Sequence, residues 1–239
     1  MNKKWFNIYG YHTKGYNETL RYLESDLGLH VIKNVEKYYQ LYIKPYHLKS
    51  TPIPDFNPLD KYEFKLTKSD RDINIMSGKL DKHLILSARA YKIFQEYNIS
   101  PHVAFGGIVF RNEDEIRDDY YYIHFYKSMW DDVDIKSSTF MYVDKVSNPS
   151  IIIDTKFSSL EDYNYATNHR HDKGYVLRKK EIVITNISEY DFFAIFDESD
   201  FLGSYYCSND FYKRLKSEKI KFEDSNELKV YSIVDVPTI

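Results

Sequence analysis

The chain has one cysteine, Cys207, among 239 residues, and it lacks any long apolar run. A single thiol excludes an intrachain disulfide and a zinc site built from several thiolates, which favours a reducing compartment. No stretch approaches the roughly 18 apolar residues that a membrane helix needs, and residues 1–6 lack the apolar segment of a signal peptide. We therefore expect a cytoplasmic protein without a membrane partner.

Glycine motifs for phosphate binding are also missing. The only glycine pair is Gly106-Gly107, and neither the Walker spacing nor a G-x-G-x-x-G motif occurs. The G-x-S-x-G elbow of hydrolases is absent as well, because the one Gly-Ser pair, Gly203-Ser204, is followed by tyrosines. The sequence therefore predicts no cofactor.

Charge is distributed in blocks, although the net charge is only -3. Residues 111–134 carry eight acidic and three basic side chains, and residues 189–210 carry six acidic side chains and no basic one. Acidic surfaces attract basic partners and repel nucleic acid. We expect a basic protein partner and no nucleic acid, although each block taken alone is also compatible with an ordinary solvated face.

Four of the seven prolines lie within residues 44–60. Closely spaced prolines prevent helix formation and interrupt strand pairing, so this segment is expected to be a linker or an extended arm. It divides the chain into a β-rich N-terminal part, residues 1–60, and an α+β domain, residues 61–239. Within the N-terminal part, β-branched and aromatic residues favour strands over residues 29–43.

Two segments have the pattern of a short strand followed by a capped helix. Ser87 follows an apolar strand and precedes apolar residues at helical spacing, and Ser208 stands in the same relation to the helix that follows it. In both cases an isoleucine twelve positions later restarts an extended segment, Ile99 or Ile220. This similarity is compatible with an internal duplication or with two independent capped helices.

The remaining pattern is mostly that of strands. They are expected over residues 120–126, 150–154, 181–187, 192–196 and 227–234. Few helices and no regular alternation of strand and helix predict an α+β fold, with a mixed or antiparallel sheet and a few amphipathic helices.

Candidate chemical groups are few. His169 and His171 alternate on a polar segment, residues 164–174, which fits a solvated loop or a metal site. Cys207 precedes a helix, where it is either a small packed residue or an activated thiolate. Scattered carboxylates leave a hydrolase open as an alternative.

Trp130 is one of two tryptophans, and three acids follow it closely: Asp131, Asp132 and Asp134. An aromatic side chain surrounded by charge has the composition of an interface hot spot. A core tryptophan with exposed neighbours has the same local sequence.

The order of several segments resembles the immunity proteins of bacterial polymorphic toxin systems, specifically the large family formerly catalogued as a domain of unknown function. The segments are Leu84-Ile85-Leu86-Ser87, Ala90-Tyr91-Lys92-Ile93-Phe94, Tyr120-Tyr121-Tyr122-Ile123-His124, Trp130-Asp131-Asp132-Val133-Asp134, Asp191-Phe192-Phe193-Ala194-Ile195-Phe196 and Tyr206-Cys207-Ser208, with Leu215 and Ile220. The resemblance covers residues 82–234.

The resemblance implies a cytoplasmic, non-enzymatic protein that neutralises a cognate toxin by binding and occluding it. It assigns no catalytic residue. The charge pattern adds the expectation that an acidic surface meets a basic groove of the toxin. The residues expected at that surface are Asp118, Asp119, Trp130, Asp131, Asp132 and Asp134. An adaptor that binds another partner through a tyrosine-rich surface remains an alternative.

Overall fold

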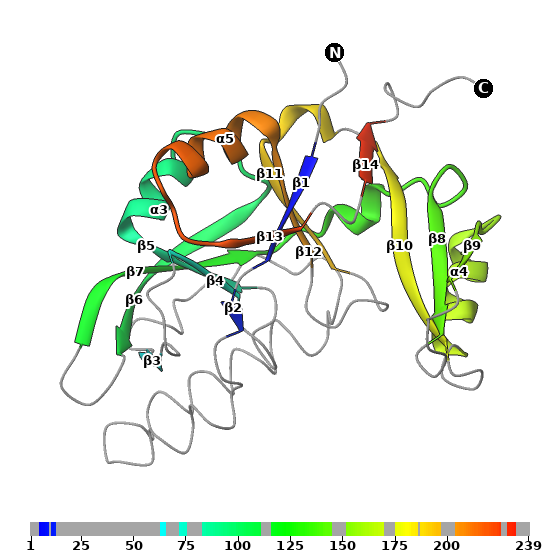
Figure 1. Ribbon diagram of the computed structural model, residues 1–239, viewed down its shortest axis with the longest axis horizontal. Coiled ribbons are helices and arrows are strands. Elements are labelled where there is room, and N and C mark those ends of the chain that lie inside the picture. The colour runs from blue at the N-terminus through cyan, green and yellow to red at the C-terminus, as the bar shows by residue number, and fades with distance from the viewer. Residues whose placement is uncertain are drawn as a thin grey trace.

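The computed structural model describes residues 5–9, 11–12, 63–65, 72–75, 83–110, 116–144, 152–169, 175–185, 187–196, 204–225 and 229–232. Their strands form three sheets (Figure 1). The predicted strands of residues 29–43 and the proline-rich segment, residues 44–60, lie outside the described residues. None of the helices in the ranges just given has the length and apolar character needed to cross a bilayer.

The largest sheet has the order β2-β4-β5-β7-β6-β3. Its strands are β2 (Tyr11–His12), β3 (Glu63–Lys65), β4 (Ile73–Ile75), β5 (His83–Ser87), β6 (His102–Phe110) and β7 (Ile116–Phe125). The four central strands pair antiparallel, whereas β2 joins β4 and β3 joins β6 in parallel. Successive residues of β7 are buried on both faces, including Tyr122 and Ile123 at 0% exposure, so this strand lies inside the molecule.

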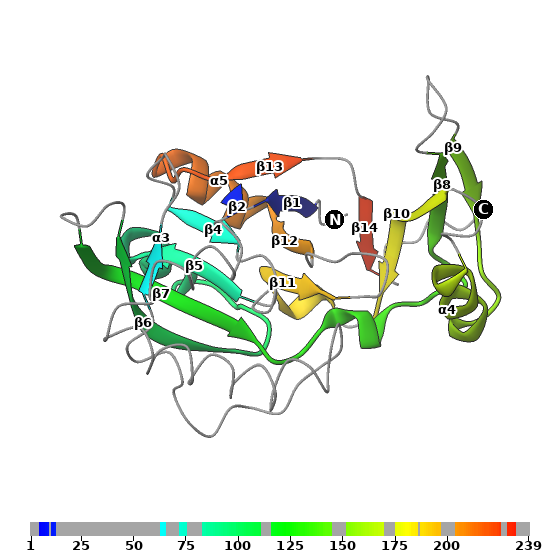
Figure 2. The same ribbon diagram turned by 90° about the horizontal axis from the view of Figure 1, so that it is seen from below.

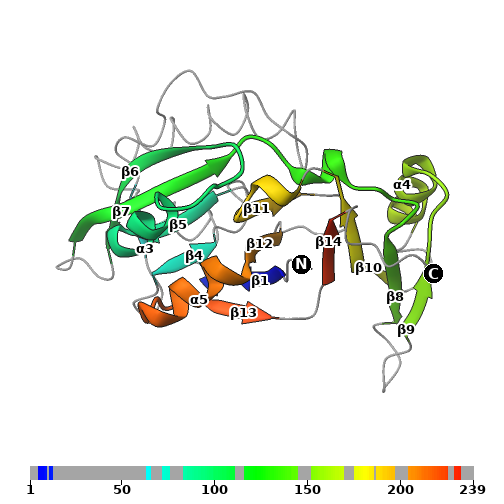
Figure 3. The same cartoon turned by 90° about the horizontal axis from the view of Figure 1, so that it is seen from above.

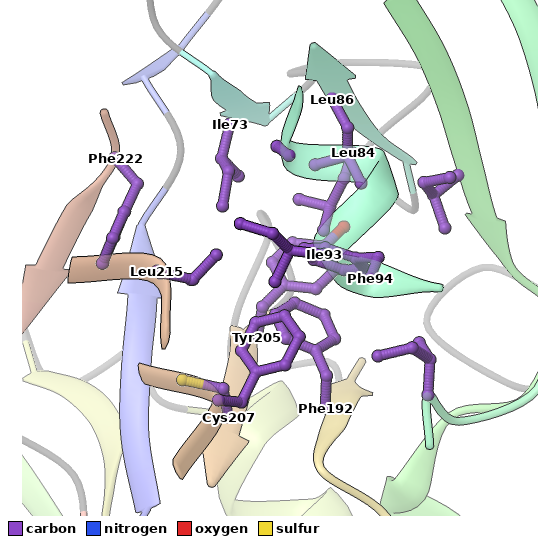
Figure 4. Close-up of a cluster of buried hydrophobic side chains, with 14 of the residues drawn as sticks. Ile73, Leu84, Leu86, Ile93, Phe94, Phe192, Tyr205, Cys207, Leu215 and Phe222 are labelled. Carbon is purple, nitrogen blue, oxygen red and sulfur yellow. The ribbon is translucent and has the colours of Figure 1, made fainter. Parts of the chain in front are cut away.

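The second sheet separates two hydrophobic cores. It has the order β11-β12-β1-β13, all antiparallel, from β11 (Phe192–Ile195), β12 (Ser204–Ser208), β1 (Trp5–Tyr9) and β13 (Glu223–Ser225). Alternate side chains of a strand point to opposite faces. Accordingly Phe192, Tyr205 and Cys207 pack into the first core (Figure 4), while Phe193 and Tyr206 pack into the second.

The third sheet has the order β14-β10-β8-β9. Its strands are β8 (Thr139–Asp144), β9 (Ile152–Thr155), β10 (Tyr175–Ile184) and β14 (Lys229–Ser232), with only β10 and β14 pairing in parallel. Helix α4 (Leu160–Asn168) covers one face through Tyr163, which contacts Phe140 with a ring-centroid distance of 4.9 Å. Figure 2 shows this sheet and α4 at one end of the molecule.

Helices α3 (Ala88–Phe94) and α5 (Asn209–Ser217) begin at the two predicted serine caps. The hydroxyl of Ser87 accepts from the backbone N–H of Ala90, and that of Ser208 accepts from the N–H of Phe211. The two helices pack together through the rings of Phe94 and Phe211, which meet edge to face at 5.0 Å. Their buried faces close the first core.

The α+β fold is therefore confirmed, with sheets of mixed and antiparallel pairing. One local expectation is wrong: Asn164 to Asn168 belong to α4 and not to a loop, while residues 170–174 lie outside the described residues. Strands β1 and β2, which precede the proline-rich segment, pair with strands that follow it. The division into parts 1–60 and 61–239 stays a prediction.

Candidate protein-interaction site

Strand β7 leads directly into the acidic segment that the sequence singled out. The chain leaves β7, turns at Ser128 and forms the short 3-10 helix η3 (Met129–Asp132). In Figures 2 and 3 this turn lies beside one end of β10. The two segments are joined by hydrogen bonds, because the backbone N–H and the hydroxyl of Thr185 both donate to the carbonyl of Asp132, at 2.9 and 3.1 Å.

Two serines with 0% exposure hold this turn in place. The hydroxyl of Ser128 accepts from the N–H groups of Trp130 and Phe196, at 3.1 and 2.9 Å, and donates to the carbonyl of Phe196 at 3.1 Å. Ser138 donates to the carbonyl of Asp134 at 2.7 Å and accepts from the N–H of Val183 at 3.0 Å. Buried hydroxyls that satisfy backbone groups on both sides leave the turn little freedom.

The second acidic block reaches the same place through the 3-10 helix η5 (Ile187–Glu189), which follows β10. The N–H of Tyr190 donates to the carbonyl of Ile187 at 3.1 Å, and the side-chain amide of Asn98 donates to the carbonyl of Glu189. Tyr190 lies within electrostatic range of Lys127 and Asp132, so the start of the second acidic block meets the end of the first. We call Trp130, Asp131, Asp132, Glu189 and Tyr190 the acidic corner.

Lys127 is the basic residue whose charge acts on this corner most directly. Its ammonium lies 3.0 Å from a carboxylate oxygen of Asp132. The hydrogen bond with Asp132 raises the pKa of Lys127, and the charges of Asp132 and Asp131 act in the same direction. Lys127 therefore stays protonated and offsets one of the three carboxylates, which leaves the corner acidic.

Tyr190 titrates under the same electrostatic influence. Burial is the main cause that raises the pKa of its phenol, and the charge and hydrogen bonding of Glu189 raise it further, while Lys127 acts in the opposite direction. Its hydroxyl is therefore protonated and neutral at physiological pH, and it keeps its ability to donate a hydrogen bond.

Trp130 is half-buried and connects the corner to the second core. Its ring lies 5.0 Å from that of Tyr163 on α4, at an interplanar angle of 48°. The residue is thus neither fully buried nor fully exposed: one side packs inward, and the rest borders the exposed Asp131. Amphipathic aromatic side chains held in this way provide rigid contact area at interfaces.

The six residues predicted at the partner surface do not form one cluster. Asp134 is engaged within its own turn, where its carboxylate accepts from the N–H groups of Lys136 and Ser137 and from the hydroxyl of Ser137. Asp118 and Asp119 lie near the start of β7. Asp119 lies six positions before Phe125, about 20 Å of extended strand, so both aspartates lie far from the corner.

Glu189, Tyr190 and Lys127 were not singled out from the sequence. The available signal was the start of the second acidic block at Glu189, which has no visible relation to Trp130 until β10 and η5 bring the two segments together.

The other candidate chemical groups do not assemble into a site in the described ranges. His169 is exposed, its ring stacks on that of Tyr165 at 4.1 Å, and His171 lies outside the described residues. A search of the described residues finds no group of three or more His, Cys, Asp or Glu side chains placed to hold a metal ion. Cys207 has 0% exposure and belongs to the first core, in agreement with its interpretation as a packed residue.

Comparison with known proteins does not assign the chain to a family. No protein-family model matches it, and no curated protein matches its sequence. The acidic corner and the sequence resemblance are therefore the basis for a functional proposal.

Proposed function

We propose that the protein is a cytoplasmic immunity protein that neutralises a cognate bacterial toxin by binding it, and that the acidic corner is the contact surface. It acts without a cofactor and without catalysis of its own. The observation that carries the proposal is the meeting of one end of each acidic block around two half-buried aromatic side chains, on a turn fixed by buried hydrogen bonds.

Each part of the corner suits binding of a basic surface. Asp131 and Glu189 are exposed, so their carboxylates place negative charge at the surface that a basic partner meets. Trp130 and Tyr190 add aromatic area at the centre, which is the usual composition of an interface hot spot with a charged rim. A preorganised turn binds with a smaller entropic cost than a loop that must first be ordered.

Occlusion of a basic groove follows from the same chemistry. Toxins that act on nucleic acid carry clustered lysine and arginine residues where phosphates bind. Carboxylates at a fixed spacing compete for those cations and steer association at low ionic strength.

The direct test is growth of a sensitive bacterium that expresses candidate toxin domains cloned from the genes that neighbour this one, with and without the protein, followed by co-purification of the pair. We expect rescue and a stable complex. Absence of both would overturn the proposal and would lead next to a metal and hydrolase assay.

Variants locate the surface. Asp131→Lys combined with Glu189→Lys is expected to abolish rescue and to weaken binding at least 100-fold, because reversed charges face a basic partner. Glu161→Lys is the control for the single variants Asp131→Lys and Glu189→Lys, each of which makes the same change of net charge. Glu161 is exposed and lies two positions before Tyr163, hence on the opposite side of α4 from the corner. Equal loss with the control and with the single variants would show that general acidity, and not the corner, is responsible.

A further inference from the structure

The first and second sheets share a detailed pattern of pairing. In the first, a hairpin of β4 and β5 leads into α3, and the chain then returns as β6, with β7 between β5 and β6. In the second, a hairpin of β11 and β12 leads into α5, and the chain returns as β13, with β1 between β12 and β13. Every pairing in both sets of four strands is antiparallel.

The registers agree as well as the order. Ser87, the last residue of β5, is opposite Tyr120 of β7, and Ser208, the last residue of β12, is opposite Trp5 of β1. Counting along both central strands, Ile123 then corresponds to Ile8, and these residues pair with Ala104 of β6 and Asp224 of β13. The segment that leads from the serine to the returning strand differs in length by one residue between the two sets. Ala104 is 17 positions after Ser87, and Asp224 is 16 positions after Ser208.

An aspartate at the start of each hairpin makes the same set of bonds. The carbonyl of Asp72 accepts from the N–H of Ser87 at 2.8 Å and its carboxylate accepts from the hydroxyl of that serine at 2.7 Å. Asp191 does the same with Ser208, at 2.7 and 3.0 Å. In each case the serine also caps the helix that follows.

The second carboxylate oxygen of each aspartate reaches across to the other set of strands. That of Asp72 accepts from the N–H of Lys221, after α5, at 2.8 Å. That of Asp191 accepts from the N–H of Asn98, after α3, at 3.3 Å. The backbone bonds are reciprocal too, because the N–H of Asp72 donates to the carbonyl of Lys221 and the N–H of Asp191 donates to that of Asn98.

We infer that the chain contains two copies of one unit, a four-stranded antiparallel sheet with one helix. Each copy is bonded to the other through an aspartate, Asp72 or Asp191, and we call the bonds of each aspartate a clasp. The first unit is β4, β5, α3, β6 and β7; the second is β11, β12, α5, β13 and β1. In the first unit the central strand, β7, follows β6, whereas in the second unit it is β1, from the N-terminal part of the chain. The two copies therefore have the same arrangement of strands in space but a different order of strands along the chain. The segment between the units carries η3, three strands of the third sheet (β8, β9 and β10), α4 and η5, whereas the fourth strand, β14, follows β13. The acidic corner therefore lies outside the repeat.

The shared core supports this relation. Side chains of both units contribute to it: Leu86, Ile93 and Phe94 come from the first unit, and Phe192, Tyr205 and Leu215 from the second (Figure 4). The contacts between α3 and α5 lie where the two units face each other.

The two sets of aspartate bonds differ in two respects. The backbone partner lies 13 positions after Ser208 in one, Lys221, and 11 positions after Ser87 in the other, Asn98. The second difference is an arginine in the first set. Arg89, two residues after Ser87, donates to the Asp72 carboxylate at 2.7 Å and also to the carbonyl of Lys219 in the other unit at 3.2 Å. The corresponding position after Ser208 is Asp210, an exposed acid. Equivalence of the units therefore predicts that an arginine at position 210 will pair with Asp191.

Amide hydrogen exchange of the full-length protein tests whether each aspartate protects a backbone amide of the other unit. Asp72→Ala is expected to speed exchange of the Lys221 amide about tenfold while that of Asn98 changes less, and Asp191→Ala is expected to do the reverse. If an alanine variant does not fold, the milder Asp72→Asn and Asp191→Asn variants are expected to show the same pattern of faster amide exchange. Exchange changes confined to the variant's own unit would overturn the clasp.

Thermal unfolding tests the equivalence of the units. The Asp210→Arg variant should melt about 2 °C above Asp210→Gln, which likewise lacks the carboxylate at the start of α5 but brings no cation. In an Asp191→Asn background this difference is expected to disappear. Equal melting of the arginine and glutamine variants in the native background would overturn the inference.

Discussion

Ser128 shows how a single buried hydroxyl determines the geometry of the acidic corner. It has 0% exposure and serves three backbone groups, two of Phe196 and one of Trp130. Serine is small enough to enter the core and carries both a donor and an acceptor, so neither alanine nor cysteine replaces it in this role.

Replacement of Ser128 by alanine should lower the free energy of unfolding by about 2 kcal/mol, because the N–H and carbonyl of Phe196 lose their bonds to the hydroxyl in a dry environment. Ser137→Ala is the control, since Ser137 is exposed and its bond to Asp134 competes with water. Urea denaturation of both variants measures the difference. Equal effects would mean that the Ser128 bonds carry no special weight.

Asp72 gives the protein a defined response to acid. Burial acts to raise the pKa of its carboxyl, but hydrogen bonds from Arg89, from the backbone of Lys221 and from Ser87 outweigh it, and the pKa lies below its usual value. Since the folded state has the lower pKa, ionised Asp72 stabilises it above about pH 4, and this contribution is lost as the pH falls through the folded pKa.

The free energy of unfolding is therefore expected to fall more steeply for the native chain than for Asp72→Asn between about pH 5 and pH 2. Arg89, whose guanidinium faces the carboxylate, remains charged over this range. Urea titrations at successive pH values give the two curves. Parallel curves would contradict the assignment of this acid-sensitive stability to Asp72.

At the scale of elements, helix α4 depends on one aromatic side chain. Tyr163 has 0% exposure and contacts Trp130, Phe140 and Phe157 at ring distances of 5.0, 4.9 and 5.4 Å. Two positions further along the helix, Tyr165 is 66% exposed. The two tyrosines are therefore chemically matched and differ in their surroundings.

We expect Tyr163→Ala to destabilise the protein by about 3–5 kcal/mol and to quench or shift the fluorescence of Trp130, because the cavity removes the support of that ring. Tyr165→Ala is expected to change stability by less than about 0.5 kcal/mol. Denaturation followed by fluorescence reports both effects. Similar destabilisation by the two variants would show that α4 contributes through its backbone and not through Tyr163.

The elements that were predicted correctly are those with a recognisable pattern in their own residues. The serine caps located α3 and α5, and runs of β-branched and aromatic residues located β7, β10 and β11. Helix α4 was missed because few of its side chains are buried, mainly Tyr163 and Thr167, and polar residues dominate the rest. The pairing of β1 with β12 depends on long-range register, which no local pattern reveals.

The candidate site was predicted in part for the same reason. Trp130, Asp131 and Asp132 are adjacent in the sequence and were recognised together. Glu189 and Tyr190 join them only because β10 returns the chain to the same corner, where Thr185 bonds to Asp132. Composition indicated an acidic surface, but tertiary pairing decided which acids share it.

At the scale of the whole molecule, the second sheet makes the two cores interdependent. Neighbouring residues of β11 face different cores: Phe192 and Ala194 the first, Phe193 and Ile195 the second. Loss of this sheet would expose both cores at once, so neither can unfold while the other stays intact.

A single cooperative unfolding transition is therefore expected, although the chain contains a repeat and a third sheet. In a Trp5→Phe background the fluorescence of Trp130 reports on the second core, and amide exchange of Leu84 to Leu86 in β5 reports on the first. In urea the two probes should give the same midpoint, and Phe193→Ala, which faces only the second core, should lower both midpoints equally. Separate midpoints, or a shift confined to Trp130, would show that the two cores fold independently and that β11 does not couple them.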